Sequence, residues 1–336
     1  MTRSTLRFLQ IGTGIVISVA CIAYIVVRVD LSAVLNAASH LDWRYLLLGL
    51  LALCIDYSLR TVRWTLMLAT AGERVLLRSS APAFLGSMAL NNVLPFRAGD
   101  FIRALVFPAA IGVTRTTATA SLVLERLIDL LILLLLLALG LSLSSGIQVP
   151  TWQRDAIFLV SVAGAGVLLC LLLLGRRVGT VFEAVSNYMR TRGSLRWAGI
   201  ADRLATFSHR LMDMARPRVL AVTLALTMVI WIAEAGVYLS LFHGMDIAST
   251  PFIALTTMAL ATLATLLPSS PGYVGPFHLA AFSAVVAAGG TPTQAAAFAL
   301  LVHLSLWIPV TLAGTLCIAF NPMFFRRNIT MDHDHE

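Results

Sequence analysis

Six apolar runs constrain the fold of this chain more than any other feature. They cover about 8–29, 43–70, 117–143, 156–175, 217–243 and 293–320. Each run has about the 20 residues that a helix needs to cross a bilayer. Only 12% of the 336 residues are charged, about half the share found in a soluble domain. We therefore predict an all-α polytopic membrane protein, a single integral membrane domain over residues 1–336 with about six full transmembrane helices.

The composition also excludes several kinds of chemistry. All 24 basic residues are arginine and lysine is absent, which excludes the P-loop lysine and Schiff-base lysines. The four cysteines lie singly in apolar runs and match no zinc or redox spacing: Cys21, Cys54, Cys170 and Cys317. We expect no cofactor, no metal and no nucleic-acid partner.

Two further apolar stretches are each interrupted near the middle. The stretch 80–107 breaks at Pro95–Gly99, and the stretch 251–290 breaks at the sequence PSSPGYVGP, Pro268–Pro276. Each half has only about 10–18 residues, which is marginal or too short for a crossing. We predict two re-entrant helical hairpins, because irregular backbone is tolerated at membrane depth where protein buries it. The alternative makes each half a separate crossing.

The distribution of arginine predicts the orientation. Residues 176–218 hold nine arginines and three acidic residues. The positive-inside rule places such segments in the cytoplasm, which predicts a bacterial inner-membrane protein with both termini cytoplasmic. Residues 176–216 would form a basic cytoplasmic connector, with an amphipathic helix over Val178–Met189 on the leaflet surface. A solvated basic loop is the alternative.

The two hairpins predict an internal repeat. With six crossings, the first hairpin enters the membrane from the cytoplasm and the second from outside. The units 43–143 and 217–320 then have opposite orientations, as in transporters built from inverted repeats. Sequence identity between the two units is negligible, so this symmetry is a topological prediction.

Charged residues inside the apolar runs predict an intramembrane network, because each costs about 2.5–3.5 kcal/mol at mid-bilayer. Residues at i, i+4 share a helix face, which groups Asp56 with Arg60 and Glu125 with Asp129. The full predicted network is Asp56, Arg60, Arg63, Glu125, Arg126, Asp129 and Glu234. In the alternative, Arg60 and Arg63 reach the interface and Glu125 and Arg126 lie at the headgroups. We expect His278 and His303 to be core residues rather than ligands.

The first break has the chemistry of an anion site. A helix that restarts at Ala98 or Gly99 exposes free N–H groups and the positive end of its dipole. Arg97 stands beside that end and matches phosphate oxygens with two donors. Asp100 can tether Arg97 or Arg103.

The second break supplies glycines where the backbone can approach a ligand closely. We expect the two tips to meet near mid-membrane around a polar cavity; in the alternative they only cap the fold. The predicted substrate-binding residues are Asn91, Asn92, Arg97, Asp100, Arg103, Gly272, Tyr273 and Gly275. The predicted hairpin-shaping residues are Pro95, Gly99, Pro268, Pro271 and Pro276.

Three motifs resemble a known family. N-x-x-x-P-x-R-x-G-[DE]-x-x-R spans Asn91–Arg103, E-R-x-x-D spans Glu125–Asp129 and P-x-x-P-G-x-x-G spans Pro268–Gly275. Their order and spacing resemble the transmembrane (flippase) domain of lysylphosphatidylglycerol synthases and its stand-alone relatives, over about residues 8–320. The resemblance implies lipid translocation, with the hairpins as the lipid-binding region.

The chain departs from that pattern at three positions. Asp100 stands where the family usually has glutamate, Tyr273 replaces a glycine, and His278 stands where many relatives have glutamate. The last two leave the identity of the headgroup open. No aminoacyl-transferase domain is expected after Arg327, so the chain should not make aminoacylated lipid itself.

The sequence favours a lipid flippase over an enzyme. We expect it to bind a polar lipid headgroup, phosphate-bearing or glycosylated, at the two hairpins and to move it between leaflets. One alternative is a non-transporting scaffold that presents lipid to a partner lipid-synthesising enzyme. Another is a membrane-embedded lipid-modifying transferase, although the D-x-D pair of Asp332 and Asp334 lies in the C-terminal tail. The oligomeric state stays open, with a homodimer as one option.

Overall fold

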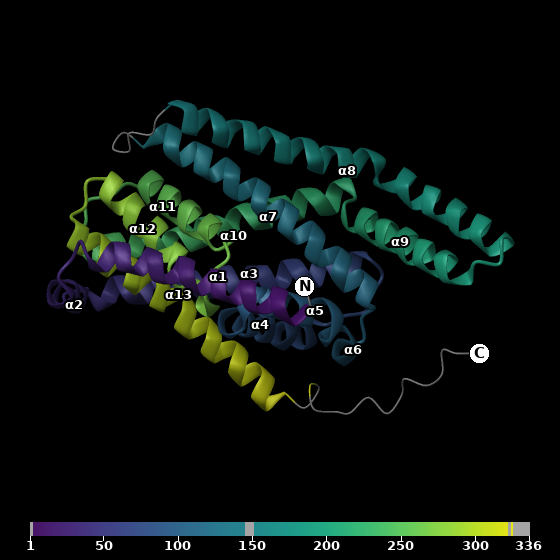
Figure 1. The fold of residues 1–336 in the computed structure, drawn as a ribbon, viewed down its shortest axis with the longest axis horizontal. Coiled ribbons are helices and arrows are strands. Elements are labelled where there is room, and N and C mark those ends of the chain that lie inside the picture. The colour runs from purple at the N-terminus through teal and green to yellow at the C-terminus, as the bar shows by residue number, and fades with distance from the viewer. Residues whose placement is uncertain (1–2, 145–150, 322–323, 325–336) are drawn as a thin grey trace.

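The computed structural model describes residues 3–144, 151–321 and 324, and within these it contains helices and no strand (Figure 1). Asp332 and Asp334 lie outside the described residues. The long helices are α1 (Arg3–Val26), α3 (Trp43–Thr70), α7 (Arg115–Leu143), α8 (Thr151–Thr191), α10 (Pro217–Gly244) and α13 (Pro292–Phe320). A helix therefore occupies each of the six predicted runs.

Length and hydropathy identify the helices best suited to cross a membrane. Among the described residues, α3, α10 and α13 are long and apolar enough. A fourth span arises if Gly12–Val26 of α1 and the short helix α2 (Leu31–Ser39), which are bent by 83°, count together. The chain is thus a multi-pass membrane protein, and the count of six crossings stays a prediction.

Local sequence explains where several helices begin. The Asp42 carboxylate accepts a hydrogen bond from Arg44 N at the start of α3. Thr291 and Gln294 form a capping box at the start of α13, with Pro292 in its first turn. These side chains satisfy N–H groups that a helix end leaves free, so the boundaries follow from short-range chemistry.

Both interrupted stretches are broken where the prolines and glycines predict. The first forms α4 (Leu77–Val93), the turn η1 (Pro95–Arg97), α5 (Ala98–Leu105) and α6 (Phe107–Ile111). The second forms α11 (Pro251–Ala264), the turn η2 (Pro271–Tyr273) and α12 (Pro276–Ala287).

The two turns share one backbone design. In each, a proline is followed by two residues with positive φ, which is costly for residues other than glycine. The values are 59° and 52° at Phe96 and Arg97, and 76° and 59° at Gly272 and Tyr273. Such strain persists only where surrounding structure enforces it, so both tips are tightly held.

The two halves of the chain pack in a reciprocal pattern. Each contains a long helix, a shorter helix, a turn, a short helix and a second long helix, in the orders α3–α4–η1–α5–α7 and α10–α11–η2–α12–α13. The first half has an additional short helix, α6, between α5 and α7. Helix α3 packs on α10, α4 packs on α13 of the other half, and α11 packs on α7. The turns η1 and η2 touch each other. Exchanging the halves leaves this set of contacts unchanged, as two related units require.

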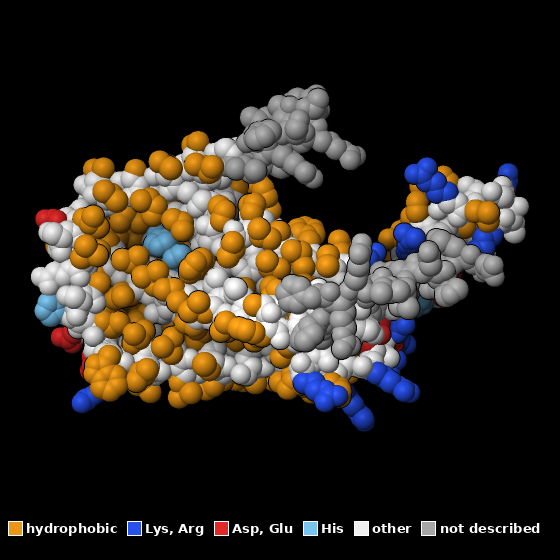
Figure 2. Space-filling view, turned by 90° about the horizontal axis from the view of Figure 1, so that it is seen from below, with side chains coloured by type: hydrophobic (Ala, Val, Ile, Leu, Met, Phe, Trp, Pro, Cys, Tyr) orange, Lys and Arg blue, Asp and Glu red, His pale blue; other side chains and the backbone are white. Residues whose placement is uncertain are grey.

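The basic connector differs from its prediction. Val178–Met189 is helical, as predicted, but it is the last part of α8, which continues to Thr191 without a break and packs along α9 (Leu195–Met214). No proline interrupts residues 151–191, and Gly175 and Gly179 let α9 approach closely, because an added Cβ would lie 2.4 Å from Met212 Sδ and 2.8 Å from His209 Cε1. This pair projects beyond the other helices (Figure 1), and arginines gather at that end of the molecule (Figure 2).

Candidate functional site

A first group of buried charges joins α3 to α10. The Arg60 guanidinium donates from Nε to Asp56 Oδ1 and from Nη2 to Glu234 Oε2, both at 2.7 Å. It also lies 4.6 Å from the centre of the Trp231 ring. One arginine thus serves two carboxylates, and the predicted Asp56–Arg60 pair is present.

A second group joins α3, α5 and α7. Arg63 donates to both Asp129 oxygens at 2.5 and 3.1 Å and to Thr227 Oγ1 at 2.7 Å. Arg103 donates to both Glu125 oxygens at 2.9 and 3.2 Å. Arg63, Arg103 and Glu125 are at most 2% exposed, so these charges join helices inside the bundle.

Asn91 and Asp100 form hydrogen bonds across the first helix break. Asn91 Oδ1 accepts from Asp100 N, and Asn91 Nδ2 donates to Asp100 Oδ1, both at 2.9 Å. Arg126 Nη2 donates to both Asp100 oxygens at 2.9 Å. Helix α5 does restart at Ala98, as predicted, but one of its free N–H groups is capped by Asn91. Of the two expected tethers of Asp100, the one to Arg103 is present, with Arg103 Nη2 3.9 Å from Asp100 Oδ1, whereas the ion pair with Arg97 is not formed and Arg126 makes the closest contact.

Arg97 has a different environment from these four arginines. Each of the four lies within 4.0 Å of at least one carboxylate, whereas no described carboxylate comes that close to Arg97. Arg97 Nη2 donates to Thr265 Oγ1 at 3.0 Å, and its guanidinium lies 5.5 Å from the centre of the Tyr273 ring. The contacts of Arg97 in the described part of the chain therefore leave its charge without a counter-ion.

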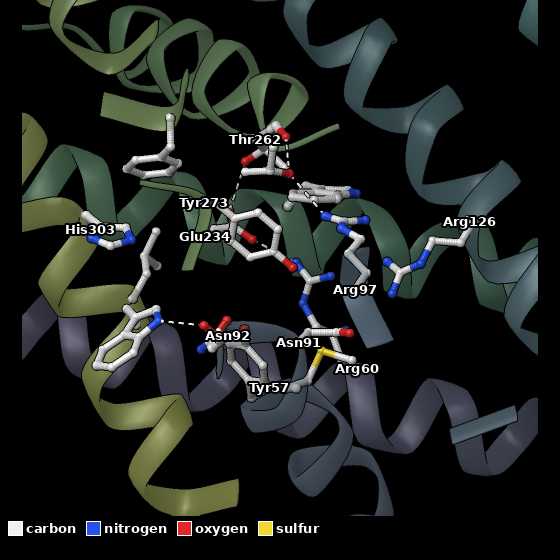
Figure 3. Close-up of a pocket in the computed structure, with 16 residues that line it drawn as sticks. Tyr57, Arg60, Asn91, Asn92, Arg97, Arg126, Glu234, Thr262, Tyr273 and His303 are labelled. Carbon is white, nitrogen blue, oxygen red and sulfur yellow. Dashed lines mark hydrogen bonds and ion pairs between the residues drawn. The ribbon is translucent and has the colours of Figure 1, made fainter. Parts of the chain in front are cut away.

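Arg97 stands between two cavities. The first, of about 150 Å³, lies between the two halves and has Arg60, Arg126, Glu234 and His303 in its walls (Figure 3). The second, of about 250 Å³, lies between η1 and η2. Four residues line both cavities: Asn91, Arg97, Thr265 and Tyr273. A polar group that passed from one cavity to the other would meet the Arg97 guanidinium.

The other predicted site residues fall into distinct positions. Asn92 lines the first cavity, and its Nδ2 donates to Thr311 Oγ1 at 2.9 Å. Gly272 lines the second cavity with Pro95, Pro268 and Pro271. Gly275 instead packs on α1, where an added Cβ would lie 2.6 Å from Ser18 Cα. Arg103 belongs to the buried network and lines neither cavity.

Gly99 allows α4 and α5 to approach closely, and we expect Gly99→Ala to lower the melting temperature. A Cβ at Gly99 would lie 2.0 Å from Ser87 O and 2.7 Å from Asn91 N, and overpacking typically costs about 1–3 kcal/mol or more. Gly164→Ala on α8, with nothing within 4 Å, is the matched control for a thermal-shift measurement in detergent. Equal melting temperatures for the two variants would contradict this packing.

The sequence reasoning missed several residues that line the first cavity. Thr262 and Thr265 end α11, just as Asn91 and Asn92 end α4. A polar residue one turn before a helix break was the available signal. Tyr57, Trp231 and Trp307 gave no such signal, because aromatic residues in apolar runs are usually core.

His278 and His303 lie together on α12 and α13. Their ring centres are 4.6 Å apart, and His303 Nε2 is 2.8 Å from Gly272 O. Among the described residues, no group of three His, Cys, Asp or Glu side chains could hold a metal ion. His303 thus supports the η2 turn.

Comparison with known proteins shows the family of this chain. Residues 11–314 match the family described as lysylphosphatidylglycerol synthase TM region. The chain belongs to this family. Glycosyltransferase AglD of Haloferax volcanii is similar to it, with 27% identity over 322 residues that cover 87% of this chain and 51% of the relative. The chain thus spans about half the length of that relative.

Proposed function

We propose that this chain binds a polar lipid at the two hairpin tips and moves its headgroup between the leaflets of a bacterial inner membrane. The headgroup carries a phosphate, alone or with a sugar. One observation carries the proposal: the Arg97 charge has no counter-ion among the described residues and borders both cavities. Arg97 is half-buried, so its charge is partly withdrawn from water, which is costly without a partner. An anionic headgroup would supply that partner.

The surroundings of Arg97 suit a phosphate. Its guanidinium can offer two parallel donors, and the Asn92 and Thr262 side chains add neutral polar groups on the cavity wall. Tyr273 covers one face of the guanidinium, which restricts its orientation. Arg126 also lines the cavity but is neutralised by Asp100. Family membership supports a lipid-related role.

The proposal includes six crossings, two re-entrant hairpins and cytoplasmic termini. The reciprocal packing of the two halves supports inverted repeats, and the arginines around α8 and α9 support a cytoplasmic position for that end.

We expect Thr191→Cys and Ala248→Cys to lie on opposite sides of the membrane. Thr191 ends α8 and Ala248 lies between α10 and α11, and both are exposed. In intact cells that express a background without the native cysteines, an impermeant thiol reagent should label Ala248→Cys. It should label Thr191→Cys only after lysis. Labelling of both positions in intact cells would contradict this topology.

Reconstituted protein should accelerate the exchange of phospholipid between leaflets. In vesicles containing fluorescent phosphatidylglycerol, we expect faster and more complete quenching by an impermeant reductant than in protein-free vesicles, with or without an imposed proton gradient. The scaffold alternative predicts lipid binding without exchange. Absence of exchange under both conditions, with folded protein, would contradict the transport proposal.

The relative named as a glycosyltransferase supports a transferase as the second candidate. An acid or base for such chemistry must be free to exchange a proton. Five buried carboxylates, the four of the predicted network and Asp100, are each paired with an arginine: Asp56, Asp100, Glu125, Asp129 and Glu234. We therefore favour binding and movement. Headgroup turnover by the purified chain would reverse that preference.

A further inference from the structure

An apolar groove of about 340 Å³ lies on the flank of the helical bundle, next to the first cavity. It is formed by α3, α4 and α13 and lined by Cys54, Tyr57, Leu77, Ala81, Leu85 and Ala313, among others. Cys54 and Leu77 are exposed and no charged residue lines the groove. The groove is therefore open to the outside of the helical bundle and has a mainly apolar wall.

The groove adjoins the first cavity, because Tyr57 lines both of them. Along α4, Leu77, Ala81 and Leu85 line the groove, and Met88 and Asn92 line the cavity. These five positions follow one another at intervals of three or four residues, so they form one stripe along a helix face. The stripe leads from the flank of the bundle to the tip of the first hairpin.

The lining of the groove is mostly apolar. No charged residue lines it, and one of its hydroxyls, Thr61 Oγ1, donates to Tyr57 O at 2.8 Å within its own helix. Binding there would therefore come mainly from apolar contact and shape. This contrasts with the cavity beyond Tyr57, whose walls include four charged and two amide side chains.

If a lipid headgroup lies at Arg97, the protein must provide space for the hydrocarbon chains attached to it. We propose that this groove binds one hydrocarbon chain of that same lipid, with Tyr57 at the junction between chain and headgroup. The inference rests on the proposed function, since it needs a headgroup in the cavity. It adds that the lipid enters between α3 and α4 and that chain structure contributes to selectivity.

Photolabelling distinguishes a specific chain site from ordinary contact with membrane lipid. The probe is phosphatidylglycerol with a diazirine in one acyl chain, mixed into phosphatidylcholine nanodiscs. The labelled peptides are identified by mass spectrometry. We expect labelling over 54–62 and 77–85 to exceed labelling at Leu312 and Leu316, which lie 58% and 54% exposed on the outer face of α13. Excess unlabelled phosphatidylglycerol should remove the signal in the groove and leave that on α13.

The variant Arg97→Asn tests whether occupancy of the groove depends on binding of the headgroup at Arg97. Loss of a charge-assisted contact should lower occupancy, and so groove labelling, about ten-fold or more, with α13 labelling unchanged. Ala81→Trp, which fills the groove, should also weaken binding of phosphatidylglycerol, whereas Leu316→Trp should not. If total binding falls in Arg97→Asn but groove and α13 are labelled equally, the chain site is wrong and the headgroup site stands. If Arg97→Asn leaves total binding unchanged, the proposed function itself is contradicted.

Discussion

Asp129→Ala should leave little folded protein. Asp129 accepts two hydrogen bonds from Arg63, whose side chain is fully buried between α3, α7 and α10. Removing one partner of a buried ion pair costs about 3–5 kcal/mol, because the other charge stays buried. Total stabilities are commonly only about 5–15 kcal/mol. Fluorescence-detected size-exclusion chromatography should show a large loss of the monodisperse peak and a lower melting temperature.

Two comparisons isolate the cause. Asp202→Ala removes the exposed partner of Arg190 on the α8–α9 pair and should leave the melting temperature unchanged, as expected for a surface ion pair. The double variant Asp129→Leu with Arg63→Met removes both charges and should recover part of the folded yield. If Asp129→Ala behaves like Asp202→Ala, Asp129 faces water or headgroups and the network is misassigned.

Sequence patterns predicted the helices and their interruptions well, because both arise from short-range chemistry. The apolar runs require helices in a bilayer, and Pro95, Gly99, Pro268 and Pro276 interrupt or restart them. The pair of Asp56 and Arg60 could be predicted because both lie on one helix face. The boundaries of α8 were harder to predict, because its apolar and basic halves differ in composition but not in helix propensity.

The partners of most network residues depend on how distant helices pack. Arg63 and Asp129 are 66 positions apart and Arg60 and Glu234 are 174 positions apart. No periodicity relates such positions. Asn91 shows the same limit: it was predicted as a substrate ligand, but both of its amide atoms contact Asp100. Arg97 likewise could not be distinguished by sequence. Among the described residues it has no carboxylate partner, whereas Arg60, Arg63, Arg103 and Arg126 each have one.

Substitution of Arg97 should weaken lipid binding without unfolding the protein. Arg97 has φ 52° and ψ 41°, a left-handed conformation that asparagine tolerates better than alanine, so Arg97→Asn removes the charge with little added strain. A charge-assisted hydrogen bond contributes about 1.5–3 kcal/mol, so affinity should fall about ten- to hundred-fold. Arg97→Lys keeps the charge but loses the paired donors, and its affinity should lie between those of wild type and Arg97→Asn.

The affinity of purified protein for phosphatidylglycerol, measured by native mass spectrometry in parallel with neutral diacylglycerol, tests the central claim most directly. Wild type should bind phosphatidylglycerol more tightly than Arg97→Lys, and Arg97→Lys more tightly than Arg97→Asn. The affinity for diacylglycerol should be the same in wild type, Arg97→Lys and Arg97→Asn. Arg192→Asn, at the exposed turn after α8, should bind like wild type. If folded Arg97→Asn binds phosphatidylglycerol as tightly as wild type, the phosphate does not lie at Arg97 and the account is wrong.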